Sequence, residues 1–189
     1  MSLRVVAGSA RGRKLAVPAG LATRPTSDRV RESMCNALHS LDAIDGADVL
    51  DLFAGSGALG IEALSRGAAS ATFVEPDRVA RSVVEANLAS TGLGASATVV
   101  AGDALRHLAR TTARYHLVLA DPPYAYADWP DLLAALAPHL HPDAVVVLES
   151  DRSVEVPPPF LVIREKRYGG TVVAFLQLLD AAPHAGDHE

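Results

Sequence analysis

Residues 51–60 are Asp51-Leu52-Phe53-Ala54-Gly55-Ser56-Gly57-Ala58-Leu59-Gly60. A mostly apolar run precedes this stretch and apolar residues at helical spacing follow it, which predicts a strand, a glycine-rich turn and a helix. Glycine lets the backbone turn sharply and approach a ligand with no side chain between them. The start of the helix adds free N–H groups and the positive end of the helix dipole. Gly55, Gly57 and Gly60 match the pattern of a dinucleotide site, so a dinucleotide is one candidate ligand.

Strand-like and helical segments alternate along the rest of the chain. The expected strands cover residues 48–53, 71–75, 97–101, 115–120, 144–149, 160–164 and 171–178. The alternation predicts an α/β fold with a Rossmann-like, doubly wound sheet. We expect seven strands in the order 3-2-1-4-5-7-6, with strand 7 antiparallel. In such sheets, ligands bind beyond the carboxyl ends of the strands.

Composition excludes several classes of protein. The chain has 189 residues, enough for one domain with a real core, and its apolar content of 49% is too high for a mainly disordered chain. No apolar run is long enough to span a membrane, and the N-terminus lacks the apolar region of a signal peptide. Cys35 is the single cysteine and is expected to be a core thiol, and the histidines lack metal-ligand spacing. We therefore expect a cytoplasmic protein, a monomer, with no bound metal.

Three acidic residues, Asp51, Glu75 and Asp103, follow three successive predicted strands. Glu75 is positioned to accept hydrogen bonds from ribose hydroxyls of a nucleoside bound at the glycine turn. Asp51 is an unfavourable neighbour for a pyrophosphate but a favourable one for S-adenosylmethionine (SAM), whose ammonium and sulfonium are positive. SAM is therefore the expected cofactor. Its expected contacts are Asp51, Phe53, Ala54, Gly55, Ser56, Gly57, Glu75, Asp103 and Ala104.

The segment Asp121-Pro122-Pro123-Tyr124 follows the predicted strand 115–120. An exocyclic amine on a nucleobase is a poor nucleophile because its lone pair is delocalised into the ring. The Asp121 carboxylate and the Pro122 carbonyl can accept hydrogen bonds from both N–H groups and turn the lone pair toward the methyl group. Pro122 and Pro123 fix the backbone, and Tyr124 can stack on the base. With the glycine turn, this segment indicates a class I SAM-dependent methyltransferase acting on an amino nitrogen.

Basic residues gather at the N-terminus. Residues 1–31 carry a net charge of +6, whereas the rest of the chain carries −11. This asymmetry predicts a basic arm that binds a polyanion. The residues expected to contact nucleic-acid phosphates are Arg4, Arg11, Arg13, Lys14, Arg24 and Arg29.

The N-terminal region divides into a predicted hairpin and a helix. Residues 3–7 and 14–17 are β-prone and flank a glycine-containing loop, and an amphipathic helix with Arg29 and Arg31 on its outer face follows residue 28. We expect the hairpin to be only loosely attached to the core. The expected division is residues 1–25 as basic hairpin and linker, 26–180 as the methyltransferase domain and 181–189 as a frayed tail.

The chain resembles the RsmD-type bacterial rRNA guanine-N2 methyltransferases from Arg4 to about Leu178. The segments that carry the resemblance are Arg4–Gly8, Arg11–Leu15, Thr23–Glu32, Asp51–Gly60, Glu62–Arg66, Glu75, Asp121–Tyr124 and Glu149-Ser150. The resemblance implies methyl transfer from SAM to N2 of one guanine of 16S rRNA, position 966 in the usual numbering, in the small ribosomal subunit. Tyr124 stands where many relatives have Phe, and Asp121 where other amino methyltransferases have Asn; stacking and the acceptor role are both kept.

Two other classes of function remain open at this stage. One is an amino methyltransferase for DNA bases or a protein glutamine, although DNA enzymes usually carry a recognition insert that 189 residues do not accommodate. The other is a non-catalytic RNA- or cofactor-binding module, or an NAD enzyme suggested by the glycine pattern.

Overall fold

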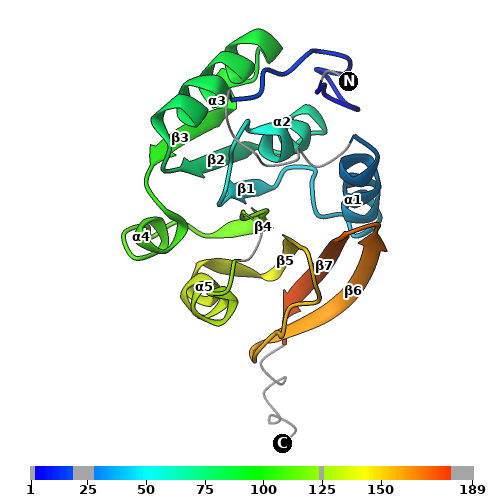
Figure 1. Ribbon diagram of the computed structural model, residues 1–189, viewed down its shortest axis with the longest axis vertical. Helices are drawn as coiled ribbons and strands as arrows, with labels where there is room; N and C mark the ends of the chain where they lie inside the picture. Colours follow the sequence, from blue (N-terminus) through cyan, green and yellow to red (C-terminus); the bar gives the residue numbers. More distant parts are fainter. Residues whose placement is uncertain (1–2, 19–27, 124–125, 180–189) are drawn as a thin grey trace, which may run out of the picture.

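A computed structural model describes residues 3–18, 28–123 and 126–179 (Figure 1). Two residues singled out in the sequence, Arg24 and Tyr124, lie outside the described residues, as does the tail from residue 180. No helix among the described residues is long and apolar enough to cross a membrane.

The strands form one seven-stranded sheet in the order β3-β2-β1-β4-β5-β7-β6. They are β1 Asp48–Asp51, β2 Ser70–Glu75, β3 Ala97–Ala101, β4 Tyr115–Ala120, β5 Leu140–Ser150, β6 Phe160–Tyr168 and β7 Thr171–Leu178. β7 is antiparallel to both of its neighbours, while the other pairings are parallel. The predicted fold, strand order and direction of strand 7 are confirmed.

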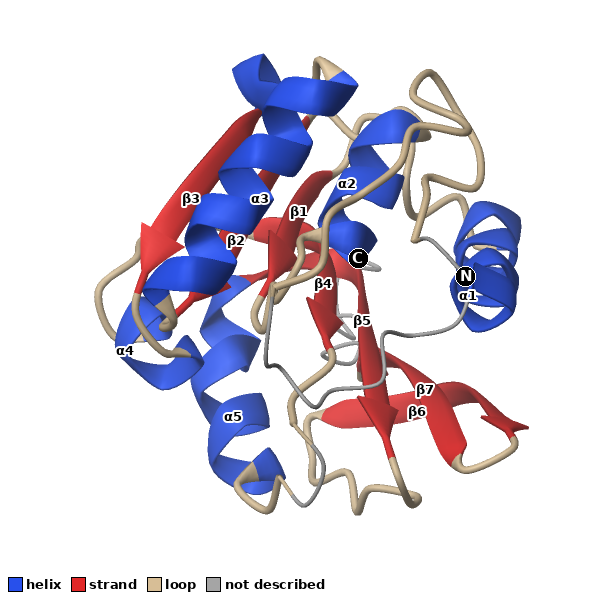
Figure 2. Cartoon of the chain, turned by 45° about the horizontal axis from the view of Figure 1, so that its top comes forward, coloured by secondary structure: helices blue, strands red, loops and turns tan. Residues whose placement is uncertain are grey.

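Helices cover both faces of the sheet (Figures 1 and 2). They are α1 Asp28–Ser40, α2 Ala58–Ser65, α3 Arg78–Thr91, α4 Ala104–Leu108 and α5 Trp129–Leu136, with short 3₁₀ turns η1 Gly94–Ser96 and η2 Ala137–His139. Side chains alternate between the faces, so Val49 packs with α1, α2 and α3 whereas Leu50 packs with α4 and α5. Almost every residue of β1 and β4 is buried, as expected for strands covered on both sides.

Several element boundaries differ from the prediction. The sequence predicts a helix from Trp129 to Leu140, but the helix ends at Leu136, because Pro138 lies in the 3₁₀ turn that follows and cannot donate to a continuing helix. β5 begins earlier, at Leu140, and β6 continues through Tyr168, past the polar residues at which the predicted strand stopped.

The N-terminal segment, residues 3–18, is docked on the helices. In place of a regular hairpin it has one isolated bridge, Arg4 with Lys14, supported by hydrogen bonds such as Val5 N to Arg13 O (3.0 Å). Its apolar residues Leu3, Val5, Ala10 and Leu15 are buried in the core shared with α1 and α2. The expectation of a loosely attached hairpin is therefore wrong.

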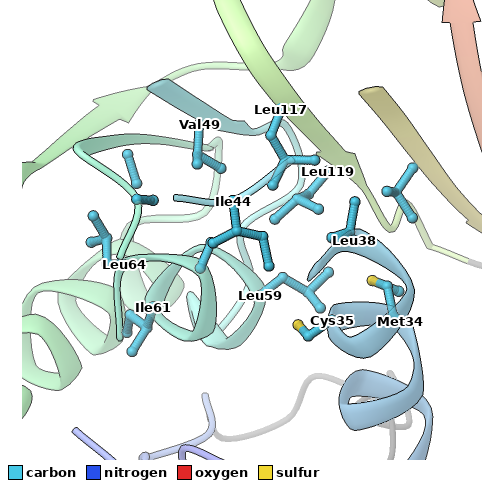
Figure 3. Close-up of a cluster of buried hydrophobic side chains, with 14 of the residues drawn as sticks. Met34, Cys35, Leu38, Ile44, Val49, Leu59, Ile61, Leu64, Leu117 and Leu119 are labelled. Atoms are coloured by element: carbon cyan, nitrogen blue, oxygen red, sulfur yellow. The ribbon is translucent and has the colours of Figure 1, made fainter. Parts of the chain in front are cut away.

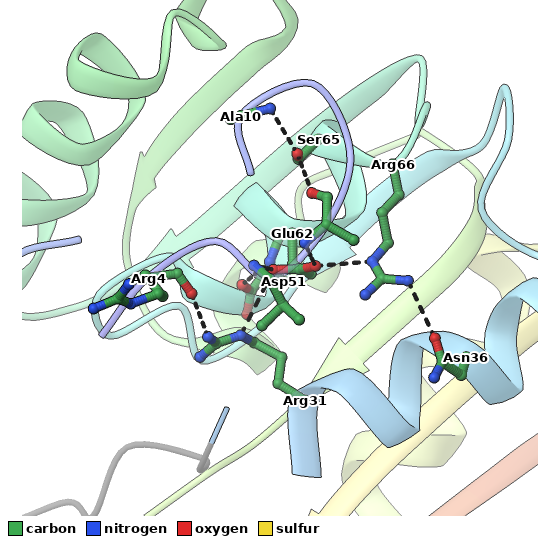
Figure 4. Close-up of polar contacts among 11 residues, drawn as sticks. Arg4, Ala10, Arg31, Asn36, Asp51, Glu62, Ser65 and Arg66 are labelled. Carbon is green, nitrogen blue, oxygen red and sulfur yellow. Dashed lines mark hydrogen bonds and ion pairs between the residues drawn. The ribbon is translucent and has the colours of Figure 1, made fainter. Parts of the chain in front are cut away.

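A buried carboxylate on α2 holds this segment in place (Figure 4). Glu62 accepts hydrogen bonds from Val6 N (2.8 Å) and Ala7 N (3.0 Å), and from Arg66 Nε (2.8 Å). Arg31 Nε lies 3.8 Å from the same carboxylate, and Arg31 donates to the carbonyl of Arg4. The side chain of Arg31 is fully buried, so its prediction as an outward-facing residue is wrong: it faces α2, where Glu62 compensates its charge.

The apolar face of α1 completes this side of the core. Met34, Cys35 and Leu38 point toward Leu59 of α2 and Leu119 of β4 (Figure 3). Burial raises the pKa of the Cys35 thiol to about 12, consistent with the expected core thiol.

We predict that Glu62→Ala lowers the free energy of unfolding by about 3–5 kcal/mol, because it removes the carboxylate that faces the buried Arg31 charge and accepts the Val6 and Ala7 N–H groups. Urea unfolding measures the difference. The matched control is Glu155→Ala, an exposed acid whose removal should change stability by less than about 0.5 kcal/mol. Equal stability of the two variants would contradict the anchoring role of Glu62.

Candidate functional site

Acidic residues from β1, β2 and the segment after β4 meet at one edge of the sheet. β1 lies between β2 and β4, with Asp51 level with Phe73 and Leu119. Glu75 is two residues beyond Phe73 and Asp121 two residues beyond Leu119. The structure thus brings three of the residues predicted from the sequence to the carboxyl ends of adjacent parallel strands.

The glycine turn follows β1 directly and needs its glycines for two reasons. Gly57 has a φ of 78° and serves as the N-cap of α2 without a capping side chain. Gly60 lies against the sheet, where a Cβ atom would come within 2.4 Å of the Phe73 ring. The turn is therefore compact, and the start of α2 is not covered by a capping side chain of its own.

Glu75 shapes this turn as well as facing it. One carboxylate oxygen accepts the Gly55 N–H (2.9 Å) and the other accepts the Asp77 N–H (2.9 Å). A carboxylate has about four acceptor positions, so Glu75 retains capacity for the ribose hydroxyls predicted from the sequence. Its role in holding the turn could not be inferred from spacing alone.

Asp51 is buried with one oxygen unused. Its Oδ2 accepts the Gly60 N–H (3.1 Å), while Oδ1 has no hydrogen-bond partner among the residues that the structure describes. Burial raises the pKa of Asp51 to about 7; the charges of Asp121 and Glu75 reinforce this rise, and the backbone N–H groups of Gly60 and Phe53 oppose it. A cationic group placed here would stabilise the ionised carboxylate.

Asn87 of α3 is a site residue that sequence reasoning missed. Its Nδ2 donates to the Ser56 carbonyl (2.8 Å) and to the Ala16 carbonyl (3.0 Å), and its Oδ1 accepts the Ala16 N–H (2.7 Å). It therefore ties the N-terminal segment to the glycine turn. An amide between the buried Val84 and Leu88 on α3 is the sequence signal that could have revealed it.

Three aromatic side chains in contact lie near the same carboxyl ends of the strands. The Phe53 ring packs edge-on against Tyr126 (5.4 Å between centroids), which packs edge-on against Trp129 (5.0 Å). Tyr126 and Trp129 were not predicted as site residues, although they are prominent in a chain with only 5% aromatic residues.

Asp103 caps α4 by accepting the Arg106 N–H (2.8 Å), and this places the buried Ala104 at the first position of that helix.

Beyond β4, Asp121 is partly buried, Pro122 is buried and Pro123 is exposed. The Pro123 carbonyl accepts the Tyr126 N–H (3.2 Å). The Asp121 side chain lies close enough to Asp51 for its charge to raise the pKa of Asp51, and the prolines restrain the backbone that follows it.

The predicted phosphate-binding residues lie on the N-terminal segment and α1. All five that the structure describes have exposed side chains: Arg4, Arg11, Arg13, Lys14 and Arg29. The described residues contain no group of three or more histidine, cysteine or acidic side chains that could hold a metal ion.

A family model described as Conserved hypothetical protein 95 matches residues 3–177. The chain is 47% identical over 122 residues to the Ribosomal RNA small subunit methyltransferase D of Escherichia coli strain K12, covering 65% of this chain and 60% of that protein. It is 34% identical over 174 residues to the Haemophilus influenzae protein of the same name, covering 88% and 89%. Among solved structures, the Escherichia coli protein yhhF is 38% identical with a TM-score of 0.83, covering 94% of this chain and 98% of that one.

We predict a pH signature of Asp51 in stability. Because the native pKa of about 7 lies above the ordinary value of 3.8, the native state keeps a proton that the unfolded chain has lost between these pH values. Stability should therefore fall as pH rises through this window, with a slope of up to about 1.4 kcal/mol per pH unit. Urea unfolding of the wild type and of Asp51→Asn isolates this contribution as their difference. The free energy of unfolding of the wild type minus that of Asp51→Asn should fall as pH rises, and a flat or rising value would contradict the assignment.

Proposed function

Since this chain belongs to the RsmD-type family, the family of the model described as Conserved hypothetical protein 95, we propose that it is an rRNA methyltransferase that modifies N2 of a guanine in 16S rRNA. The observation that carries the proposal is the position of Asp121-Pro122-Pro123 beyond β4, beside the buried Asp51 and Glu75. This arrangement puts an acceptor for an amine next to a site suited to a cationic nucleoside. The target guanine is the one at position 966 in the usual numbering, within the small subunit.

SAM is the methyl donor, and it supplies an electrophilic methyl group on a positively charged sulfur. The unused Oδ1 of Asp51 and the raised pKa of this carboxyl fit its ammonium group. Glu75 takes the ribose, and the exposed Asp103 with the neighbouring Ala104 binds the base. The glycine turn allows close approach through Phe53, Ala54, Gly55, Ser56 and Gly57.

Asp121 and the Pro122 carbonyl orient the target amine. Each accepts a hydrogen bond from one N–H, which turns the nitrogen lone pair toward the methyl group. Bound SAM would supply the methyl group from its sulfonium, and the Asp121 carboxylate would accept the proton that the amine loses once it is methylated. The burial of Pro122 and the hydrogen bond from the Tyr126 N–H to the Pro123 carbonyl hold these acceptors in place, and we propose that Tyr124 stacks on the base.

The exposed basic side chains of the N-terminal segment, with Arg24 and Arg29, position the RNA through its phosphates. Such contacts set orientation, whereas base recognition depends on the site itself. The enzyme acts as a monomer on the assembled or nearly assembled subunit in the cytoplasm.

The proposed function is tested by methylation in vitro and in cells. Purified enzyme with methyl-labelled SAM should label small subunits isolated from cells that lack it, and digestion with mass mapping should place one methyl group on N2 of the guanine. Labelling of duplex DNA or of a protein glutamine instead would favour another amino methyltransferase. SAM binding without labelling of any of these would favour a non-catalytic module.

We predict that Asp121→Ala lowers the single-turnover rate by roughly 10²–10³-fold, the scale of losing one transition-state hydrogen bond, while SAM affinity stays nearly constant. Asp121→Asn keeps an acceptor oxygen and should recover part of the rate. Asp143→Ala removes an exposed acid at the far end of β5 and is the matched control. Calorimetry with SAM accompanies each rate, and a near-normal rate in Asp121→Ala would reject the orienting role.

A further inference from the structure

A second group of basic side chains lies outside the N-terminal segment, on the edge strand β6. Arg164, Lys166 and Arg167 are all exposed, and we call them the β6 basic end. None of them takes part in an ion pair found within the described ranges. Glu165, the acid between them, accepts a hydrogen bond from Ser153 Oγ (2.9 Å). These cations are therefore available to an anionic partner.

Strand register places the β6 basic end near the carboxyl ends of the central strands, where Asp121 stands. Arg167 is level with Val172 of β7, and Val172 is level with Ser150 at the end of β5. On the other side of β5, Leu148 is level with Ala120, the residue before Asp121. The turn between β6 and β7 thus extends past the same edge at which Asp121 stands.

Protection of the sheet edge against aggregation does not account for this placement. Basic residues commonly serve that purpose on edge strands. Here, however, the apolar half of β6 has no charge to protect it, and Leu161 and Val162 are 51% and 40% exposed. The cations are instead confined to the half of β6 that lies nearest the carboxyl ends of the central strands.

The β6 basic end is also structurally connected to the N-terminal segment. The Tyr168 hydroxyl, which follows Arg167, is hydrogen bonded to Ser33 Oγ of α1. On the same helix, Arg31 donates to the Arg4 carbonyl of the N-terminal segment. Figure 1 shows α1 between the N-terminal segment and the region where β6 ends and β7 begins. Basic side chains thus flank the site on three connected elements.

We propose that the β6 basic end binds phosphates of the RNA next to the target nucleotide, as a second docking contact besides the N-terminal segment. The inference rests on the proposed function, since it takes RNA as the partner. β6 lies three strand positions from β4, about 14 Å at the usual strand spacing, so the contacted phosphates belong to nucleotides close to the modified one. Phosphate contacts of this kind act on substrate binding, whereas the chemical step depends on Asp121.

The test compares two double variants that remove equal charge. The variant Lys166→Gln/Arg167→Gln removes two charges of the β6 basic end. The control variant Arg110→Gln/Arg114→Gln removes two exposed arginines just before β4, at the opposite end of that strand from Asp121. Methylation of small subunits gives KM and kcat, binding is measured at several salt concentrations, and calorimetry gives SAM affinity. Urea unfolding checks that both proteins are folded.

For the β6 variant, we expect a KM for subunits raised roughly threefold or more, and a salt slope lowered by about 0.7–0.9 for each phosphate that is no longer neutralised. Its kcat, SAM affinity and stability should match the wild type, as should every property of the control variant. Equal KM and slope in wild type and β6 variant would overturn the inference, and so would an equal weakening in both variants. If the wild type itself does not methylate subunits, the proposed function fails instead, and the two failures are distinguishable.

Discussion

The carboxylate of Glu62 is the interaction on which the arrangement of the N-terminal half depends. It is fully buried on α2, yet its hydrogen bonds go to the backbone of residues 6 and 7 and to Arg66, with Arg31 of α1 beside it. An irregular segment has no ladder to satisfy its N–H groups, so it needs acceptors from elsewhere. Glu62 supplies two of them, and α2 begins at the glycine turn. The proposed RNA-docking segment and the proposed cofactor turn are therefore built on the same helix.

Other carboxylates at this edge combine folding with function. Glu75 holds Gly55 and Asp77, and Asp51 holds Gly60, so hydrogen bonds within the protein define the shape of the turn. The position of Asp51 carries a desolvation penalty, which is expressed in its raised pKa. Such preorganisation lowers the cost of ordering when a cationic ligand binds. The negative charge of Asp51, four residues before Gly55, favours a sulfonium nucleoside over a pyrophosphate.

Sequence reasoning predicted the sheet order because the alternation of strands and helices restricts the topology to few possibilities. It did not predict the docking of residues 3–18, since charge made them look like a solvated arm and no periodicity reports backbone donors satisfied by a distant Glu62. Arg31 was misplaced for the same reason: periodicity marks the apolar face of α1 but does not show a buried cation with a partner on α2. Asn87 and Tyr126 act through contacts between elements far apart in sequence. Sequence alone located acids at strand ends, and the tertiary arrangement was needed to show what each one holds.

The distribution of charge bears on how an acidic protein approaches a polyanion. Residues 32–189 carry a net charge of −11, which disfavours RNA as a partner, whereas the first 31 residues carry +6. Repulsion over most of the molecule and attraction along one flank select an orientation during diffusional encounter. That flank runs from the N-terminal segment over α1 to the turn between β6 and β7, which ends at the carboxyl edge of the sheet. Under the proposed function, this field would orient the RNA toward the carboxyl ends of the strands, where Asp121 stands, and the net negative charge would contribute to the selection of substrate geometry.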